Sequence, residues 1–173
     1  MKRWVLALCL ALASSVAAAG ETRFSGVFTR VSDGDTVWVQ LDQEDGTPRR
    51  KRVKLRLVGL DAPERCQAHG REAGAALASR VQGRPVTVRR RATDDYGRAL
   101  GTLWVGDEDV GAWLVREGHA WSARYRGNPG PYAAEEGDAR KGRRGLFAKP
   151  LPAIEPRVFR REHGRCEAAF DQP

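Results

Sequence analysis

The sequence predicts a single domain of the α+β class, mainly β, built as a five-stranded β-barrel with three helices. Three observations predict this class. The chain has 173 residues, which is enough for one well-formed core and short for two substantial domains. Segments with apolar residues at alternate positions come first, and segments with helical spacing dominate after them. One helical segment lies between the third and fourth predicted strands, which suggests an OB-type barrel.

Three strands are predicted before the first helix. Residues 24–31 form the first, and Asp33-Gly34 after it is a turn signal. Residues 36–41 form the second, because three aliphatic side chains occupy alternate positions there. Asp45-Gly46 signals the next turn. Residues 53–57 form the third strand, in which aliphatic side chains alternate with lysine and arginine.

The second half of the domain is predicted to be mostly helical. Its elements, in order, are a helix over 71–81, strands over 84–91 and 98–105, a helix from Asp109 to Gly118, and a helix over 132–144. Asp109 is a good N-cap, because its side chain can accept hydrogen bonds from the first turn. Gly83 and Gly145 follow two of the helices and are typical C-terminal stops. We therefore expect one helix between the third and fourth strands of the barrel and two helices after the fifth strand.

The first nineteen residues have the pattern of a secretory signal peptide. Lys2 and Arg3 precede an apolar run over residues 4–13, which is too short to span a bilayer, and small residues precede Gly20. The alternative is a membrane anchor. We expect a signal peptide over 1–19, a folded domain over 20–150 and a basic C-terminal tail over 151–173. The exported chain is expected in the periplasm or the medium, as a monomer without stable membrane insertion.

The tail is rich in proline and arginine, and no structure is predicted for it. Cys9 leaves with the signal peptide, so Cys66 and Cys166 remain in a chain bound for an oxidising compartment. We expect these two cysteines to pair, which would tie the tail back to the domain; the alternative is two free thiols. Closing a loop of about 100 residues contributes up to ~4.7 kcal/mol in the chain-entropy model.

The charge of the chain suits a polyanionic partner. The full sequence carries +8, with 30 basic and 22 acidic residues. Without Lys2 and Arg3 the basic residues number 28, which leaves 28 − 22 = +6. Cationic side chains release counterions from phosphates, so DNA or RNA fits this charge. The alternative is a surface that is merely soluble.

Two aspartates are candidate ligands of a metal ion. Asp35 begins the second predicted strand, and Asp61 follows the end of the third, so antiparallel pairing could bring their carboxylates together. Two carboxylates that close repel each other, and a cation relieves the repulsion. Oxygen ligands favour calcium or magnesium, and a main-chain carbonyl from the turn at residues 61–63 could complete the set.

Hydrolytic chemistry could be supplied by three further residues. Glu64 lies three positions after Asp61 and could orient or deprotonate a water molecule. Arg56 and Arg98 could each bind phosphate oxygens through two N–H groups. A metal, a base and two guanidinium groups are sufficient for attack of water on a phosphodiester.

Each of these segments has a structural interpretation when it is taken alone. Asp33-Gly34 is then a turn, residues 61–64 are a strand exit or a helix start, and Arg98 is solvated. An EF-hand is excluded because Val37 fills its third ligand position. His69, His119 and His163 do not have the spacing of zinc ligands.

Taken together, the segments resemble the thermonuclease (staphylococcal-nuclease-like) family. That family has the pattern D-G-D-T, then R-x4-D-[TA]-P-E, then D-x-Y-G-R. This chain supplies Asp33-Gly34-Asp35-Thr36, Arg56 with Asp61-Ala62-Pro63-Glu64, and Asp94-Asp95-Tyr96-Gly97-Arg98. The similarity extends over about residues 27–147.

The resemblance implies a calcium-dependent endonuclease that cuts DNA and RNA, favours unpaired regions and leaves 3′-phosphate ends. The implied site consists of the calcium ligands Asp35, Asp61 and the Ala62 carbonyl, the water-activating Glu64, the phosphate-binding Arg56 and Arg98, and Tyr96 and Tyr125 beside the nucleotide.

The chain departs from the best-known pattern at two places near the site. Alanine at position 62 replaces a threonine, and the segment over residues 64–72 is short and contains Cys66. After the second helix, one tyrosine, Tyr125, stands where the family has two.

The rival function is a binding module that does not cut, and the intact acids argue against it, because clustered carboxylates would repel a polyanion. A third reading is a secreted structural or adhesion domain, which would not need the acidic and basic set at all.

Overall fold

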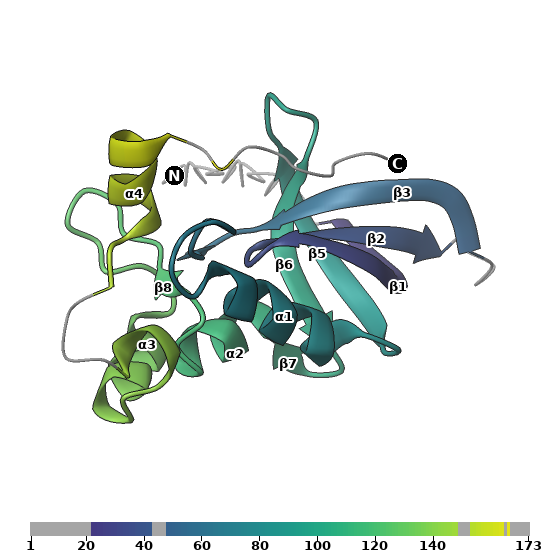
Figure 1. Ribbon diagram of the computed structural model, residues 1–173. Helices are drawn as coiled ribbons and strands as arrows, with labels where there is room; N and C mark the ends of the chain where they lie inside the picture. The colour runs from purple at the N-terminus through teal and green to yellow at the C-terminus, as the bar shows by residue number, and fades with distance from the viewer. Residues whose placement is uncertain (1–21, 43–47, 149–152, 165, 167–173) are drawn as a thin grey trace, which may run out of the picture.

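The computed structural model describes residues 22–42, 48–148, 153–164 and 166, and it forms a β-barrel with helices on one side (Figure 1). The barrel strands are β1 (Thr22–Asp33), β2 (Thr36–Asp42), β3 (Pro48–Leu57), β5 (Pro85–Thr93) and β6 (Ala99–Val105). Their order is β3-β2-β1-β5-β6, and β3 also pairs with β6, which closes the barrel. The short strand β7 (Glu108–Asp109) extends the same sheet from β6, and β4 (Leu60–Asp61) and β8 (Trp121–Ser122) form a separate two-stranded sheet.

The predicted alternation along the strands places aliphatic side chains inside the barrel. Val37 and Val39 of β2 are fully buried, and so are Leu55 of β3 and Leu103 of β6. All the barrel pairings are antiparallel except β3–β6, which is parallel over three residue pairs beginning at Leu55 and Ala99. The five-stranded barrel predicted from the sequence is therefore confirmed.

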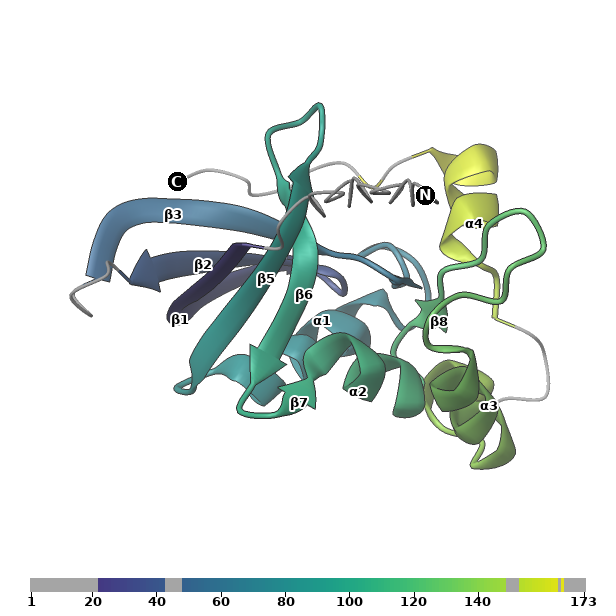
Figure 2. The same ribbon diagram turned by 180° about the vertical axis from the view of Figure 1, so that it is seen from behind.

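The helices cover one side and one end of the barrel (Figures 1 and 2). They are α1 (Gly70–Val81), α2 (Val110–Arg116), α3 (Ala133–Lys141), a 3₁₀ turn η1 (Gly145–Phe147) and α4 (Pro156–His163). Helix α1 contacts β1 and α2, and α2 contacts β6 and α3. Asp109 caps α2 as predicted, since its carboxylate accepts hydrogen bonds from the N–H groups of Gly111 and Ala112.

Helix α4 lies in the C-terminal tail, for which no structure was predicted from the sequence. It begins with Pro156 in its first turn. Proline is favoured there because N–H groups of the first turn have no partner within the helix, so the missing N–H costs nothing. Pro156 is the residue that α4 buries, and the rest of the helix is polar or partly exposed. A helix this short is held by tertiary contacts, which an amphipathic pattern does not reveal.

No helix among the residues that the structure describes is long and apolar enough to cross a membrane. The predicted signal peptide over residues 1–19 and the start at Gly20 lie outside the described residues.

Candidate active site

Asp35 is placed by the tight turn between β1 and β2. A Cβ atom added to Gly34 would lie 2.7 Å from the Cβ of Ala62, so the glycine lets this turn pack against the loop after β4. The Asp35 N–H donates to Oδ1 of Asp33 at 3.2 Å, and the hydroxyl of Thr36 donates to Oδ1 of Asp35 at 2.8 Å. Asp35 is 4% exposed, so the turn buries a carboxylate at the rim of the barrel.

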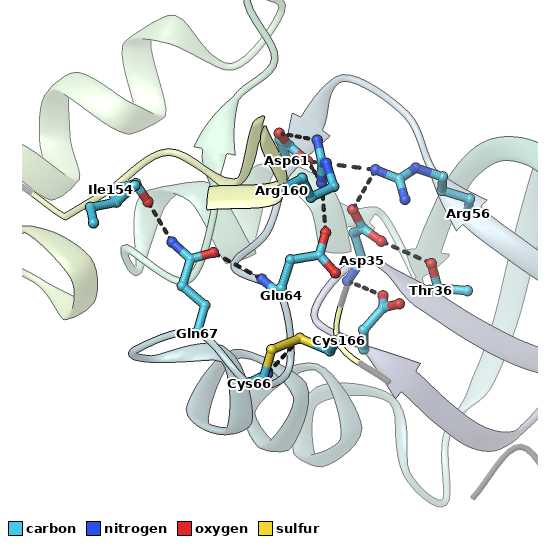
Figure 3. Close-up of polar contacts among 11 residues, drawn as sticks. Asp35, Thr36, Arg56, Asp61, Glu64, Cys66, Gln67, Ile154, Arg160 and Cys166 are labelled. Carbon is cyan, nitrogen blue, oxygen red and sulfur yellow. Dashed lines mark hydrogen bonds and ion pairs between the residues drawn. A yellow bond between two sulfur atoms is a disulfide. The ribbon is translucent and has the colours of Figure 1, made fainter. Parts of the chain in front are cut away.

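Arg56 lies between the two predicted metal ligands (Figure 3). Antiparallel pairing of β2 with β3 places Arg56 opposite Thr36. Its Nη2 atom is 3.0 Å from Oδ2 of Asp35 and 3.5 Å from Oδ1 of Asp61. Asp61 itself belongs to β4, which pairs with β8. The two aspartates that the sequence predicted to approach each other therefore converge on one positively charged nitrogen.

Burial dominates the electrostatics of both aspartates. It raises the pKa of Asp35 well above the ordinary value; the charge of Asp33 adds to the increase and Arg56 opposes it. Burial also raises the pKa of Asp61, although the charge and hydrogen bonds of Arg160 counteract part of the effect. The neighbouring arginines thus do not fully offset the cost of burying the two negative charges, and an added cation would reduce this cost.

The loop after β4 carries Glu64 and is fixed by a buried glutamine. The N–H of Glu64 donates to Oε1 of Gln67 at 3.1 Å, and the N–H of Gln67 donates to the Glu64 carbonyl at 2.8 Å. Gln67 is 8% exposed. The backbone of Glu64 is therefore held at both its N–H and its carbonyl.

Arg98 is oriented by Asp94 at the turn between β5 and β6. Oδ2 of Asp94 accepts from Nε of Arg98 at 2.8 Å and lies 2.7 Å from Nη2. Although burial acts to raise the pKa of Asp94, the hydrogen bonds from Arg98 outweigh it and lower that pKa. The pair holds the plane of the guanidinium group in one orientation.

These side chains line one cavity of about 360 Å³ at the end of the barrel. Its walls include Asp35, Arg56, Ala62, Glu64, Arg98 and Arg160. Asp61 lines a neighbouring cavity of about 500 Å³, and Arg56 and Arg160 border both. Five of the six predicted catalytic and metal-binding residues thus line one cavity, and the sixth, Asp61, lines the neighbouring one.

The chain is similar in sequence to known nucleases. Residues 54–149 match the family model described as staphylococcal nuclease homologue. The chain is 39% identical over 159 residues to protein ParB of Escherichia coli, covering 85% of each chain. It is 35% identical over 149 residues to a micrococcal nuclease of Shigella flexneri, covering 80% of this chain and 81% of the relative. An uncharacterized endonuclease of Escherichia coli is 37% identical over 130 residues, covering 73% and 80%.

The chain belongs to the staphylococcal nuclease family. It is accordingly a phosphodiester-hydrolysing nuclease built on the family's barrel. The resemblance read from the three sequence motifs is confirmed at the level of the family, and the individual roles of the motif residues stay predictions.

The donor set of this staphylococcal nuclease relative fits a hard divalent cation. Among the described residues, no group of three His, Cys, Asp or Glu side chains has the arrangement of a metal site. The predicted set, however, has two carboxylates and one main-chain carbonyl, and both carboxylates already share one cationic nitrogen. Ala62, which would supply the carbonyl, is buried and lines the same cavity as Asp35. Oxygen atoms alone make up this set, as calcium prefers.

The two predicted nucleotide contacts lie apart from the acids. Tyr96 is 68% exposed, and the guanidinium carbon of Arg98 is 5.4 Å from the centre of its ring. Tyr125 is 70% exposed and has Arg126 over its ring at 5.2 Å. Neither tyrosine is among the residues that line the 360 Å³ cavity. Tyr96 contacts Arg98, a residue of the cavity wall.

Arg160 of α4 is the site residue that the sequence analysis missed (Figure 3). Its Nη1 atom is 2.7 Å from Oε1 of Glu64, and its Nη2 atom is 3.3 Å from Oδ2 of Asp61. Cys66 and Cys166 form a disulfide with a Cα–Cα distance of 5.7 Å. The expected pairing of the cysteines could have revealed that α4 lies near the site. Cys66 follows Glu64 by two positions and Cys166 follows Arg160 by six, so the disulfide brings α4 to the acids.

Proposed function

We propose that this nuclease is a calcium-dependent endonuclease that hydrolyses DNA and RNA, with unpaired regions favoured, and leaves 3′-phosphate ends. The observation that carries the proposal is the convergence of Asp35 and Asp61 on one cationic nitrogen, beside a cavity that holds Glu64 and two further arginines. Endonuclease names among its relatives support the reaction class. The product ends and the calcium requirement follow from the family resemblance.

Asp35, Asp61 and the carbonyl of Ala62 are the groups that would hold calcium. When bound there, the ion polarises a phosphoryl oxygen and offsets negative charge on the phosphate. The buried position of Asp35 supports this role, because a carboxylate whose pKa is raised by burial gains most from a nearby positive charge.

Glu64 would accept the proton of the attacking water molecule. Its side chain is 22% exposed and lines the cavity, so it is accessible to a water molecule beside the phosphate. Its fixed backbone limits the positions that the carboxylate can adopt. A positioned general base contributes roughly 10²- to 10⁴-fold to the rate.

Arg56 and Arg98 would bind the phosphate that is cut. Both line the cavity from the barrel side and are partly exposed, at 28% and 24% of their side chains. Their planar guanidinium groups match two phosphate oxygens and answer the charge that develops as water attacks. Tyr96, which contacts Arg98, and Tyr125 would lie beside the nucleotide.

We also propose that the mature protein is an exported monomer, in the periplasm or the medium, that begins near Gly20. The signal-peptide pattern of residues 1–19 supports export. The mass of the secreted protein tests the start site, and size-exclusion chromatography with light scattering tests the monomer. A mass that retains residues 1–19 would contradict the cleavage.

The decisive experiment measures degradation of single-stranded DNA and RNA by purified mature protein with added calcium, with magnesium and with a chelator. We expect cleavage with calcium that the chelator abolishes, and product ends that become extendable only after phosphatase removes a 3′-phosphate. Binding of DNA without cleavage under every condition would instead identify a binding module.

A further inference from the structure

The C-terminal segment is fastened to the loop that carries Glu64 at three points. Gln67 donates a side-chain hydrogen bond to the carbonyl of Ile154, before α4 begins. Arg160, within α4, pairs with Asp61 and Glu64. After α4, Cys166 is bonded to Cys66, and its sulfur also accepts the N–H of Cys66 at 3.0 Å. These contacts bracket α4 on both sides.

The same glutamine connects the backbone of Glu64 to the C-terminal segment. Gln67 is buried, its Oε1 atom accepts the N–H of Glu64, and its amide donates to Ile154. Displacing the C-terminal segment from the active site would require breaking this hydrogen bond, two ion pairs and the disulfide. The segment is therefore a permanent wall of the active site.

Arg160 reduces the repulsion between two acids, Asp61 and Glu64. Nη1 donates to Glu64 and, at 3.5 Å, to Oδ1 of Asp61, while Nη2 donates to Oδ2 of Asp61, a forked arrangement that a lysine ammonium cannot reproduce. Burial alone would lower the pKa of Arg160, but its bond to Glu64 and the charge of Asp61 raise it, so the group stays charged. Its side chain is 29% exposed, so the ion pairs are partly shielded from water.

We propose that Arg160 is a positioning residue of the nuclease site: it holds the Glu64 carboxylate in place, and the Cys66–Cys166 disulfide holds Arg160. This inference rests on the proposed function, in which Glu64 accepts a proton from water. Because Arg160 also contacts Asp61, it opposes cation binding in the absence of substrate. Its removal should therefore have opposite effects on two measurements.

The test compares Arg160→Ala with Arg161→Ala. Arg161 is on the same helix, is 71% exposed and pairs with its neighbour Glu162, so the control has the same change of charge without the contact. We expect kcat of Arg160→Ala to fall roughly 10- to 100-fold, as for losses of groups that orient catalytic residues. Arg161→Ala should stay within about twofold of the wild type. Arg160→Lys should recover a minor part of the activity, and added guanidinium at low concentration should partly restore Arg160→Ala.

Calcium titration by calorimetry, without substrate, supplies the second measurement. Removal of one positive charge beside Asp61 should tighten calcium binding about 3- to 10-fold in Arg160→Ala. Slower turnover with tighter calcium binding is the expected signature. Weaker calcium binding together with a lower melting temperature would mean that Arg160 has only a structural role, and would overturn the inference.

A double-mutant cycle tests the part played by the disulfide. Cys66→Ser with Cys166→Ser should lower kcat as much as Arg160→Ala does, and combining all three changes should add little, because the effects act through one contact. Fully additive losses would overturn the link between the disulfide and Arg160.

If the wild type is active and Arg160→Ala is equally active, the positioning role is refuted and the proposed function stays intact. An inactive wild type would refute the proposed function itself.

Discussion

Two of the acid–arginine clusters among the described residues differ in how their charges balance. In the first, Glu136 of α3 is 3% exposed and accepts from Arg124, from Arg140 and from the N–H of Ser122. In the second, two arginines, Arg56 and Arg160, contact three carboxylates at the end of the barrel. Those carboxylates are Asp35, Asp61 and Glu64.

The difference appears in the pKa directions. Burial acts to raise the pKa of Glu136, but hydrogen bonds from Arg140, Arg124 and Ser122 outweigh it and lower that pKa. Burial wins at Asp35 and Asp61, whose pKa values are raised. A cluster built for stability satisfies its acid completely, whereas the candidate active site keeps acids that its own arginines do not satisfy. Such a shortage of positive charge leaves room for a metal ion.

The largest effect should come from removing the base in the second cluster. Glu64→Gln keeps the shape of the side chain but cannot accept a proton, so kcat on single-stranded DNA should fall roughly 10²- to 10⁴-fold. Thermal unfolding should change little. Near-wild-type turnover in this variant would remove Glu64 from the mechanism and weaken the contrast between the clusters.

A smaller loss should follow from Arg98→Lys. Lysine keeps the charge but loses the planar fork that Asp94 orients, so we expect a decrease in kcat/KM of roughly 10- to 100-fold. Arg84→Lys, on an arginine outside the cavity, is the matched control. If both variants remain fully active, Arg98 is an ordinary surface residue.

Glu136→Gln should affect stability and leave the chemistry unchanged. Loss of the charged acceptor should lower the free energy of unfolding by about 1–3 kcal/mol at neutral pH. Because the pKa of Glu136 is lowered in the folded protein, this advantage is complete above its ordinary value of 4.5 and shrinks as the pH falls through the folded value. Chemical denaturation at several pH values measures it, with Glu135→Gln as the control. A large loss of kcat in folded Glu136→Gln would show that the first cluster also serves catalysis.

Asp35→Asn should have the opposite effect on stability. Since burial raises the pKa of Asp35, its ionisation costs folding free energy at neutral pH, and the amide should stabilise the protein while removing a metal ligand. The gain should shrink as the pH falls toward the ordinary value of 3.8, where the folded state keeps the proton. The melting temperature from pH 4 to 7 reports this, compared with the exposed Asp95→Asn. Destabilisation at pH 7 would mean that the pair with Arg56 outweighs burial.

Much of the fold could be predicted because the strands obey a simple rule. Alternating aliphatic side chains in residues 36–41 and 53–57 correspond to buried positions of β2 and β3, except that Val53 is partly buried. Asp109 and Gly83 marked helix ends through local backbone chemistry. Helix α4 is short, rich in arginine and has no side-chain hydrogen bond at its N-cap, so local rules did not detect it. Its position depends on contacts with residues about 90 to 100 positions earlier in the chain.

The candidate site was predictable to the extent that its residues lie in short motifs. Asp35, Glu64 and Arg98 come from three such segments, and the structure brings all three to one cavity. Spacing could not show that Arg56 bridges both aspartates, because that depends on the register of β2 with β3. Arg160 was hidden for a different reason: nothing next to it in the sequence distinguishes it from Arg157 or Arg161.

The disulfide also determines what a single proteolytic cut would do. It joins positions 100 residues apart, so the polypeptide from Cys66 to Cys166 is one covalent ring. Residues 125–129 of that ring are exposed and form an accessible site for a protease. A cut there would open the ring without separating the barrel from α4. The nicked protein would migrate as one molecule without reductant and as two fragments with it. The disulfide would still hold α4 beside the barrel residues of the active site.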